Sequence, residues 1–191
     1  MLNIDYPKIE EKKFPNLEVK MVEPTIKINL RGKNRDFFTK IGKILSIVLP
    51  TESNTSATIK NVSALWLSPD EWMVYGNNID KNVNLSLENE ISKLNLGSIT
   101  NVSDQWVLIN LNGKNVFEVL SKGSPFDFNK FKNTKNVVVQ TLLNHVDVIL
   151  HHNDIDNVDL FVRKSFSEYL WLWINDSSSF LQSWSQVIKS E

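Results

Sequence analysis

The sequence contains no cysteine, which excludes disulfides, thiolate nucleophiles and thiolate-bound metals. Glycine is also scarce, and its six residues stand too far apart to form a GxGxxG fingerprint or a phosphate-binding P-loop. Neither a GxSxG nucleophile motif nor an HExxH zinc motif occurs. Because the common motifs for redox and hydrolytic chemistry are missing, we predict no catalytic residues and no bound cofactor in this chain.

The chain also lacks an excess of either charge. Its 21 basic and 22 acidic residues leave a formal net charge of −1, which gives no overall field to steer the protein onto nucleic acid or an anionic membrane. The longest apolar run, residues 169–174, is far too short to span a bilayer, and the first residues lack the apolar stretch of a secretory signal. We therefore expect a cytoplasmic protein with no nucleic-acid and no membrane partner.

At 191 residues the chain is long enough for one domain or two small fused lobes, and its apolar pattern predicts an α+β fold. Three prolines and mixed charges in residues 1–24 are typical of an irregular N-terminal arm. Residues 25–103 then predict a first lobe, a ferredoxin-like split β-α-β-β-α-β unit with both helices on one face of an antiparallel sheet. Its predicted elements are a strand at 26–30, a helix at 34–49, strands at 57–67 and 72–76, a helix at 87–94 and a strand at 98–103.

Residues 104–191 are predicted to form a second α+β lobe that ends in a long helix. Its predicted elements are a strand at 105–111, a helix around 116–120, strands at 137–143, 146–152 and 158–164, and the C-terminal helix. Ser165 and Glu168 have the spacing of a capping box, which predicts that this last helix opens with a side-chain cap.

A predicted turn at residues 68–71 carries the adjacent carboxylates Asp70 and Glu71 beside Trp66 and Trp72. Its proline presets the φ angle of a turn, although its serine and glutamate also have the spacing of a helix capping box. We favour the turn because the apolar run resumes at once. A carboxyl desolvated beside the indoles would suit a general acid, but turn formation is the commoner use of such residues and contact with a partner is a third interpretation.

The three histidines do not suggest a metal site. His151 and His152 are adjacent in a predicted strand, so their side chains point to opposite faces and cannot readily share one ion. His145 shares a face with His151 only if the strand is regular. We interpret these residues as surface histidines at a strand end, ahead of metal binding through His151 and Asp154, and we predict no metal.

Tryptophan is abundant for this mass, and aromatic side chains anchor buried protein interfaces. The six tryptophans are at positions 66, 72, 106, 171, 173 and 184. An aromatic-rich core is the simplest explanation. On a helix, however, Trp171 and Trp173 project about 200° apart, so only one of them can fully face the core of this chain. The other indole is a candidate for a docking face.

Several segments, in their order and spacing, resemble the gamma subunit of heterotetrameric sarcosine oxidase over about residues 28–184. They are Leu30-Arg31-Gly32, Leu49-Pro50, residues 64–72 (ALWLSPDEW), Val102-Ser103-Asp104, Gly113, residues 122–127 (KGSPFD), residues 140–142 (QTL), residues 162–166 (VRKSF) and residues 169–173 (YLWLW). The sequence departs from the family pattern at Ser124, Phe126, Phe128 and Lys164. The last departure leaves Arg163 as the better candidate for a bidentate contact.

This resemblance implies a subunit of a complex that oxidatively demethylates sarcosine to glycine, passes electrons through flavins to oxygen and hands the one-carbon unit to tetrahydrofolate. It implies larger alpha and beta subunits and a small delta subunit as partners, which would hold the FAD, FMN, NAD and tetrahydrofolate. It also implies that the two fused lobes are related to the folate-binding aminomethyltransferase fold. We therefore expect a non-catalytic structural subunit, and the alternative is a free-standing folate-binding or aminomethyltransferase-like protein.

Three of the segments that carry the resemblance supply the candidate subunit-interface residues. These residues are Trp66, Pro69, Asp70, Glu71, Trp72, Gly123, Pro125, Phe126, Asp127, Phe128, Arg163, Phe166, Trp171 and Trp173.

Overall fold

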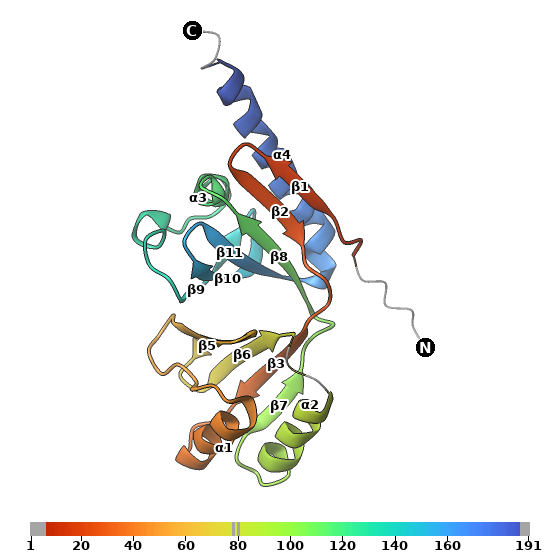
Figure 1. The fold of residues 1–191 in the computed structure, drawn as a ribbon, viewed down its shortest axis with the longest axis vertical. Coiled ribbons are helices and arrows are strands. Elements are labelled where there is room, and N and C mark those ends of the chain that lie inside the picture. The colour runs from red at the N-terminus through yellow and green to blue at the C-terminus, as the bar shows by residue number, and fades with distance from the viewer. Residues whose placement is uncertain (1–6, 78, 80, 188–191) are drawn as a thin grey trace. The chain divides into compact units, whose positions relative to one another are not determined.

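The computed structural model describes residues 7–77, 79 and 81–187, apart from the side chains of residues 81, 130 and 182–187. The chain divides into two compact units (Figure 1). The first unit consists of Thr25–Ser103 and Asn136–Val138, and the second contains the described residues of Met1–Pro24, Asp104–Lys135 and Val139–Glu191.

The first unit is a five-stranded antiparallel sheet with two helices packed on one face. Its elements are β3 (Ile26–Arg31), α1 (Arg35–Leu45), β4 (Ser56–Ile59), β5 (Val62–Ser68), β6 (Glu71–Gly76), α2 (Lys81–Leu87), the π-helical turn η1 (Glu88–Ser92) and β7 (Ser98–Asn101). The strand order is β4-β5-β6-β3-β7. Without β4 this is the predicted split β-α-β-β-α-β unit, so that prediction is confirmed.

Helix α1 has a clear start and stop in the sequence. Asn34 is the N-cap, and its side-chain oxygen accepts a hydrogen bond from the backbone N–H of Phe37 at 2.7 Å. The helix ends at Ser46, whose φ of 54° is left-handed. It is therefore shorter than the predicted 34–49 helix, and Val48, which lies within the predicted range, is outside the helix and exposed.

The core of the first unit lies between the sheet and these helices. Alternate residues of β3, Ile28 and Leu30, pack against Phe37 and Ile41 of α1. Because strand side chains alternate between faces, Asn29 and its neighbours Lys27 and Arg31 lie on the opposite face of the sheet.

The predicted strand at 57–67 is instead a hairpin of β4 and β5. Ile59 pairs with Val62, so Lys60 and Asn61 form a two-residue turn in which Lys60 adopts a φ of 54°. Lysine rarely adopts a positive φ, so Lys60 gives no signal for a turn in the sequence. The apolar residues on both sides of it therefore led to the prediction of one continuous strand.

The second unit is built on a six-stranded sheet of order β1-β2-β8-β11-β10-β9, whose neighbouring strands run antiparallel. Its elements are β1 (Glu11–Phe14), β2 (Leu17–Met21), β8 (Trp106–Asn112), α3 (Val116–Ser121), the 3-10 turn η2 (Phe128–Lys130), β9 (Val137–Leu143), β10 (Val146–Asp154), β11 (Asn157–Arg163), the 3-10 turn η3 (Lys164–Phe166) and α4 (Ser167–Val187). The two antiparallel sheets and the C-terminal helix confirm the predicted fold class.

The prediction of an irregular arm over residues 1–24 is wrong for the two strands β1 and β2. Leu17, Val19 and Met21 alternate along β2 and are buried, and β2 pairs with β8. Asn16, with a φ of 53°, makes the turn of the hairpin. The prolines and charges of this segment obscured a short amphipathic strand.

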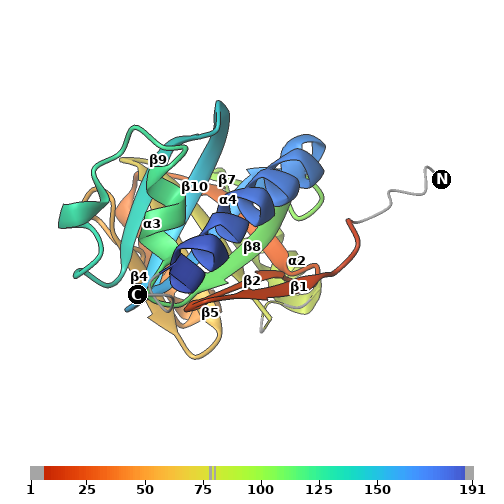
Figure 2. The same ribbon diagram turned by 90° about the horizontal axis from the view of Figure 1, so that it is seen from above.

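The long C-terminal helix is confirmed, but its predicted capping box is not. The chain leaves β11 at Arg163, which caps no backbone group with its side chain, and turns through η3 before α4 begins. Ser167 then donates a hydrogen bond to the Lys164 carbonyl at 2.7 Å. Helix α4 packs against β1, β11 and α3 (Figures 1 and 2). None of the described helices is long and apolar enough to cross a membrane.

Candidate functional site

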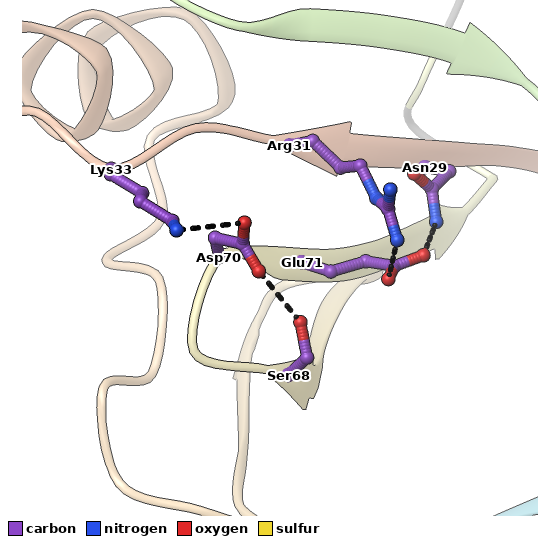
Figure 3. Close-up of polar contacts among 6 residues, drawn as sticks. All are labelled: Asn29, Arg31, Lys33, Ser68, Asp70 and Glu71. Carbon is purple, nitrogen blue, oxygen red and sulfur yellow. Dashed lines mark hydrogen bonds and ion pairs between the residues drawn. The ribbon is translucent and has the colours of Figure 1, made fainter.

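A cluster of polar side chains joins β3 to β6 beside the turn at residues 68–71 (Figure 3). Arg31 pairs with Glu71 in the strand register, and its Nη2 donates to Glu71 Oε2 at 2.5 Å. Asn29 lies two residues earlier on the same face of β3, and its Nδ2 donates to Glu71 Oε1 at 2.7 Å. Both oxygens of one carboxylate are therefore occupied by donors from the neighbouring strand.

The turn itself is held by Asp70. Ser68 donates its hydroxyl to Asp70 Oδ1 at 3.0 Å, and Lys33 Nζ lies 3.4 Å from Oδ2 (Figure 3). The backbone N–H of Gly32 also donates to the Asp70 carbonyl at 3.1 Å. Strand β5 ends at Ser68 and β6 begins at Glu71, so the predicted turn is confirmed and the alternative of a helix start is wrong.

The electrostatics of this cluster keep both carboxylates ionised. Burial alone would raise the pKa of Glu71, but the hydrogen bonds from Arg31 and Asn29 outweigh it, and the pKa lies below its usual value. The hydroxyl of Ser68 is the main cause of a lowered pKa at Asp70, with Lys33 adding to it. A general acid needs a carboxyl that keeps its proton, so this arrangement favours the turn interpretation over acid catalysis.

The two tryptophans beside this turn pack on the helix-covered face of the sheet. Trp66 and Trp72 are paired across β5 and β6. Trp72 is buried against Phe37 and Phe38, and its Nε1–H donates to the Pro50 carbonyl at 2.8 Å. Its inclusion among the interface candidates is therefore corrected: Trp72 belongs to the core, and its indole N–H is satisfied within the unit.

The other interface candidates in this segment keep part of their surface accessible. Trp66, Asp70 and Glu71 are partly buried, and Pro69 is exposed.

A groove of about 700 Å³ lies on the helical side of the first unit. Lys40 of α1 and Glu90 of η1 form an ion pair of 2.5 Å across it. Ile44 and Leu94 contribute apolar surface. The groove has the size of a small-molecule site, but no sequence motif predicted it.

In the second unit, the loop at 123–128 is only partly accessible. Pro125 and Asp127 are exposed, and Phe126 is half-buried with its ring 5.1 Å from that of Phe128. Phe128 is buried and packs against Phe131 at 6.0 Å. Phe128 is therefore corrected from an interface candidate to a core residue, because the 3-10 turn η2 directs it inward.

The interpretation of the histidines as surface residues is confirmed for His145, which is exposed in the turn before β10, but it is wrong for the other two. His151 and His152 are both fully buried in β10. The ring of His152 stacks on Phe131 and meets Phe117 edge-on, and its Nδ1–H donates to the Thr134 carbonyl at 2.6 Å. Burial lowers the pKa of both histidines, that of His151 to about 3, and the proximity of the two rings adds to the effect at His151.

Sequence reasoning missed a polar row across the face of the second sheet that carries no helix. Asn110, Asp159 and His151 are aligned across β8, β11 and β10. Asn110 Nδ2 donates to Asp159 Oδ1 at 2.7 Å, and Asn153 Nδ2 donates to Oδ2 at 3.0 Å. Polar residues at alternate positions of otherwise apolar strands were the available signal. Among the described residues, no three His, Cys, Asp or Glu side chains gather closely enough to hold a metal ion.

The tryptophans at positions 171 and 173 of the C-terminal helix lie on different sides of it, as the geometry of an α-helix predicted. Trp171 is buried, so it is corrected from an interface candidate to a core residue, while Trp173 is half-buried. Trp173 lies directly over Gly123: a Cβ at that glycine would stand 2.5 Å from the indole Cη2. The 123–128 loop thus covers part of Trp173, the indole that does not fully face the core.

The segment before this helix is exposed. Arg163 is positioned by β8, because its guanidinium carbon lies 4.2 Å from the centre of the Trp106 ring and its Nη1 donates to Gln105 Oε1 at 2.8 Å. Phe166 is 50% exposed. Tyr169 and Phe180 also expose half of their surface, and these two residues were missed because only the tryptophans of the helix were considered.

The architecture defines a class of fold that is shared with solved structures. A chain of heterotetrameric sarcosine oxidase from Corynebacterium sp. U-96, in complex with pyrrole 2-carboxylate, is similar with a TM-score of 0.80 and 21% identity over 90% of this chain and 88% of that one. The glycine cleavage system aminomethyltransferase T from Bartonella henselae is similar with a TM-score of 0.62 and 11% identity. This similarity covers 84% of this chain but 46% of the transferase. At these identities the likeness establishes the fold.

The family follows from the sequence itself. A model of the sarcosine oxidase, gamma subunit family matches residues 31–180, most of the chain, and the chain belongs to that family. The resemblance drawn from the sequence segments is thereby confirmed. A search of curated proteins gave no match.

Proposed function

We propose that this chain is the gamma subunit of a heterotetrameric sarcosine oxidase and that its role there is structural. The match of residues 31–180 to the gamma subunit family is the observation that carries the proposal. The fold shared with a chain of the Corynebacterium complex supports it. The partners would be the larger alpha and beta subunits and a small delta subunit.

The chemistry of the complex would then belong to the partner subunits. They would hold FAD, FMN, NAD and tetrahydrofolate, demethylate sarcosine to glycine and form peroxide and methylene-tetrahydrofolate. The side chains with catalytic potential in this chain support a structural role. Glu71 is held ionised by two donors, and the Nδ1–H of His152 is taken by a backbone carbonyl within an aromatic cluster.

The fold shared with aminomethyltransferase T favours a second candidate function, a free-standing folate-binding or aminomethyltransferase-like protein. The two candidates differ in what the isolated chain does. A folate-binding protein would bind a reduced folate alone, and the ligand would quench tryptophan emission. A structural subunit would show neither binding nor turnover without its partners.

Co-expression with the alpha, beta and delta chains of the same organism tests the proposal. We expect one co-eluting complex in size-exclusion chromatography that produces peroxide from sarcosine, and no peroxide from the isolated chain. The matched control is the same co-expression without this chain. Separate elution of this chain from an otherwise assembled, active complex would contradict the proposal, and saturable quenching of the isolated chain by a reduced folate would favour the second candidate.

A further inference from the structure

Four aromatic residues on α4 and the turn before it form one accessible stripe. Phe166, Tyr169, Trp173 and Phe180 follow one another at spacings of three, four and seven residues, which places them on one side of a helix of 3.6 residues per turn. The exposed fractions are 50% for Phe166, 50% for Tyr169 and 55% for Phe180. We call these four residues the aromatic stripe.

Neighbouring elements hold the rings of the stripe in place. Asn144 Nδ2 donates to the hydroxyl oxygen of Tyr169 at 2.6 Å, and Trp173 packs over Gly123. Lys122 Nζ donates to the carbonyl of Ser177 at 2.9 Å and lies 5.9 Å from the centre of the Phe180 ring. Side chains that are already ordered lose little entropy when a partner covers them, so the stripe is prepared for binding.

The area of the stripe fits the centre of a protein interface. An aromatic side chain buries about 150–250 Å² when it is fully covered, so four partly exposed ones offer about 300 Å². A standard interface buries about 800 Å² on each partner. The stripe would therefore form the apolar core of one such interface.

One charge lies beside the stripe and limits which partner can cover it. Asp176 is exposed between Trp173 and Phe180 along the helix, and its carboxylate forms no ion pair with the described residues. The cation beside Phe180, Lys122, is already engaged by the Ser177 carbonyl and the Phe180 ring, so we expect the cation that pairs with Asp176 to come from the partner. Burying an unpaired carboxylate is costly, which argues for a partner with a basic side chain.

We propose that the aromatic stripe is the surface through which this chain docks onto a larger subunit of its complex. The partner site is an apolar groove that receives the rings, with a lysine or arginine at its edge to pair with Asp176. This inference rests on the proposed function and specifies which surface carries it. The family match includes all four residues of the stripe.

The test uses the full chain co-expressed with the alpha, beta and delta subunits. The stripe variant carries Tyr169→Asp and Phe180→Asp, and a second variant carries Asp176→Lys. The matched control is Leu94→Asp, because Leu94 is a comparably exposed apolar residue, at 54%, that lines the groove of the first unit. Circular dichroism and melting temperature of each isolated chain check that the variants fold.

We expect the stripe variant and the Asp176→Lys variant to fold. Recovery in the complex should fall about tenfold or more for the stripe variant, as expected when central anchors of an interface are lost, and by a smaller factor for Asp176→Lys, whose charge lies at the edge of the interface. The Leu94→Asp variant should be recovered as well as the unmodified chain. Failure of the unmodified chain to join the complex would contradict the proposed function itself. A complex that recovers the folded stripe variant undiminished would overturn the docking inference alone, as would a loss seen only with Leu94→Asp. A homodimer of the unmodified chain that the stripe substitutions dissociate would also overturn it.

Discussion

Glu71 shows most directly how the position of a residue in a strand determines its hydrogen bonds and its charge. It occupies the first position of β6, where the strand register brings Arg31 opposite and Asn29 within reach on the same face. Two donors compensate the burial of one carboxylate, so the group stays charged although it is largely covered. Its role is to join β3 to β6 at the end where the chain turns.

Replacing Glu71 with glutamine tests this role. The amide keeps the shape but accepts weaker hydrogen bonds and carries no charge for Arg31, so we expect the free energy of unfolding to fall by about 1 kcal/mol. Urea denaturation at pH 7 measures it. Asp70→Asn is the matched control, because the Asp70 side chain is more exposed, at 39% against 21% for Glu71, and its loss should be smaller. Equal losses for both variants would show that Glu71 has no special role.

At this scale the sequence predicted local backbone structure but not the burial of single side chains. The turn at 68–71 could be predicted because proline presets its φ angle. The burial of Trp72, Phe128 and Trp171 could not, because a tryptophan or phenylalanine is suited equally to a core and to an interface. Which of the two applies depends on the elements packed over it.

At the scale of elements, the contact between the 123–128 loop and α4 depends on one missing side chain. Gly123 lets the indole of Trp173 lie against the backbone, and the N–H of Asn144 donates to the Gly123 carbonyl at 2.9 Å. The loop, the turn between β9 and β10, and the helix thus meet at one position. The segments containing Gly123 and Trp173 were both predicted as interface candidates, but their mutual contact was not.

A Gly123→Ala substitution should disturb this junction. The new methyl group would stand 2.5 Å from Trp173 Cη2, so the indole must move, and overpacking of this kind costs about 1–3 kcal/mol. The measurement is the melting temperature together with tryptophan emission, which should shift as the ring becomes more accessible. The matched control is Gly42→Ala within α1, whose nearest atom would be the Ile47 carbonyl oxygen at an ordinary 3.5 Å.

The control should behave in the opposite sense. Alanine in a helix interior is more favourable than glycine by up to about 1 kcal/mol, so Gly42→Ala should raise the melting temperature or leave it unchanged. A Gly123→Ala variant as stable as the parent, with unchanged emission, would mean that the loop moves away from Trp173 without cost.

Elements with one strong periodic signal could be predicted from the sequence, and those with conflicting signals could not. The strand at 137–143 and the long C-terminal helix appear where their apolar patterns placed them. The strands β1 and β2 did not, because proline and charge outweighed the alternation of three apolar residues in a short segment. Tertiary pairing with β8 supplies the stability that the local sequence does not show.

At the scale of the whole molecule, the two buried histidines make stability depend on pH. Unfolded histidine has a pKa of about 6.5, whereas in the folded protein burial lowers the pKa of His151 to about 3 and lowers that of His152 as well. The unfolded chain therefore binds more protons in this window. The free energy of unfolding is highest above about pH 6.5 and falls as the pH is lowered toward 3.

We expect a slope of about 1.4 kcal/mol per pH unit for one such histidine below pH 6. Urea denaturation at several values between pH 5 and 7 measures this slope above the range where carboxylates with lowered pKa values, such as Asp154, take up protons. A His151→Gln variant should be less sensitive to pH, whatever its absolute stability. Parallel curves for the variant and the unmodified chain would contradict the assignment.

The overall class of the molecule could be predicted from segments that are individually weak. Their order carried the resemblance to the gamma subunit family, and residues 31–180 confirm it. The aromatic stripe could not be predicted, because the helix carries apolar residues on several sides and only packing against β1, β11 and α3 shows which of them remain uncovered.

The pairing of β2 with β8 has a consequence for how the chain is made. Met21 pairs with Ile109, so the whole of the first unit's main segment is synthesised between two strands that must lie side by side. On the ribosome, β1 and β2 emerge first but find no place in a sheet until β8 follows. The first unit can fold in the meantime, while the second unit is still incomplete. The hairpin of β1 and β2, although it is made before the first unit, therefore reaches β8 only after the main segment of that unit has been synthesised.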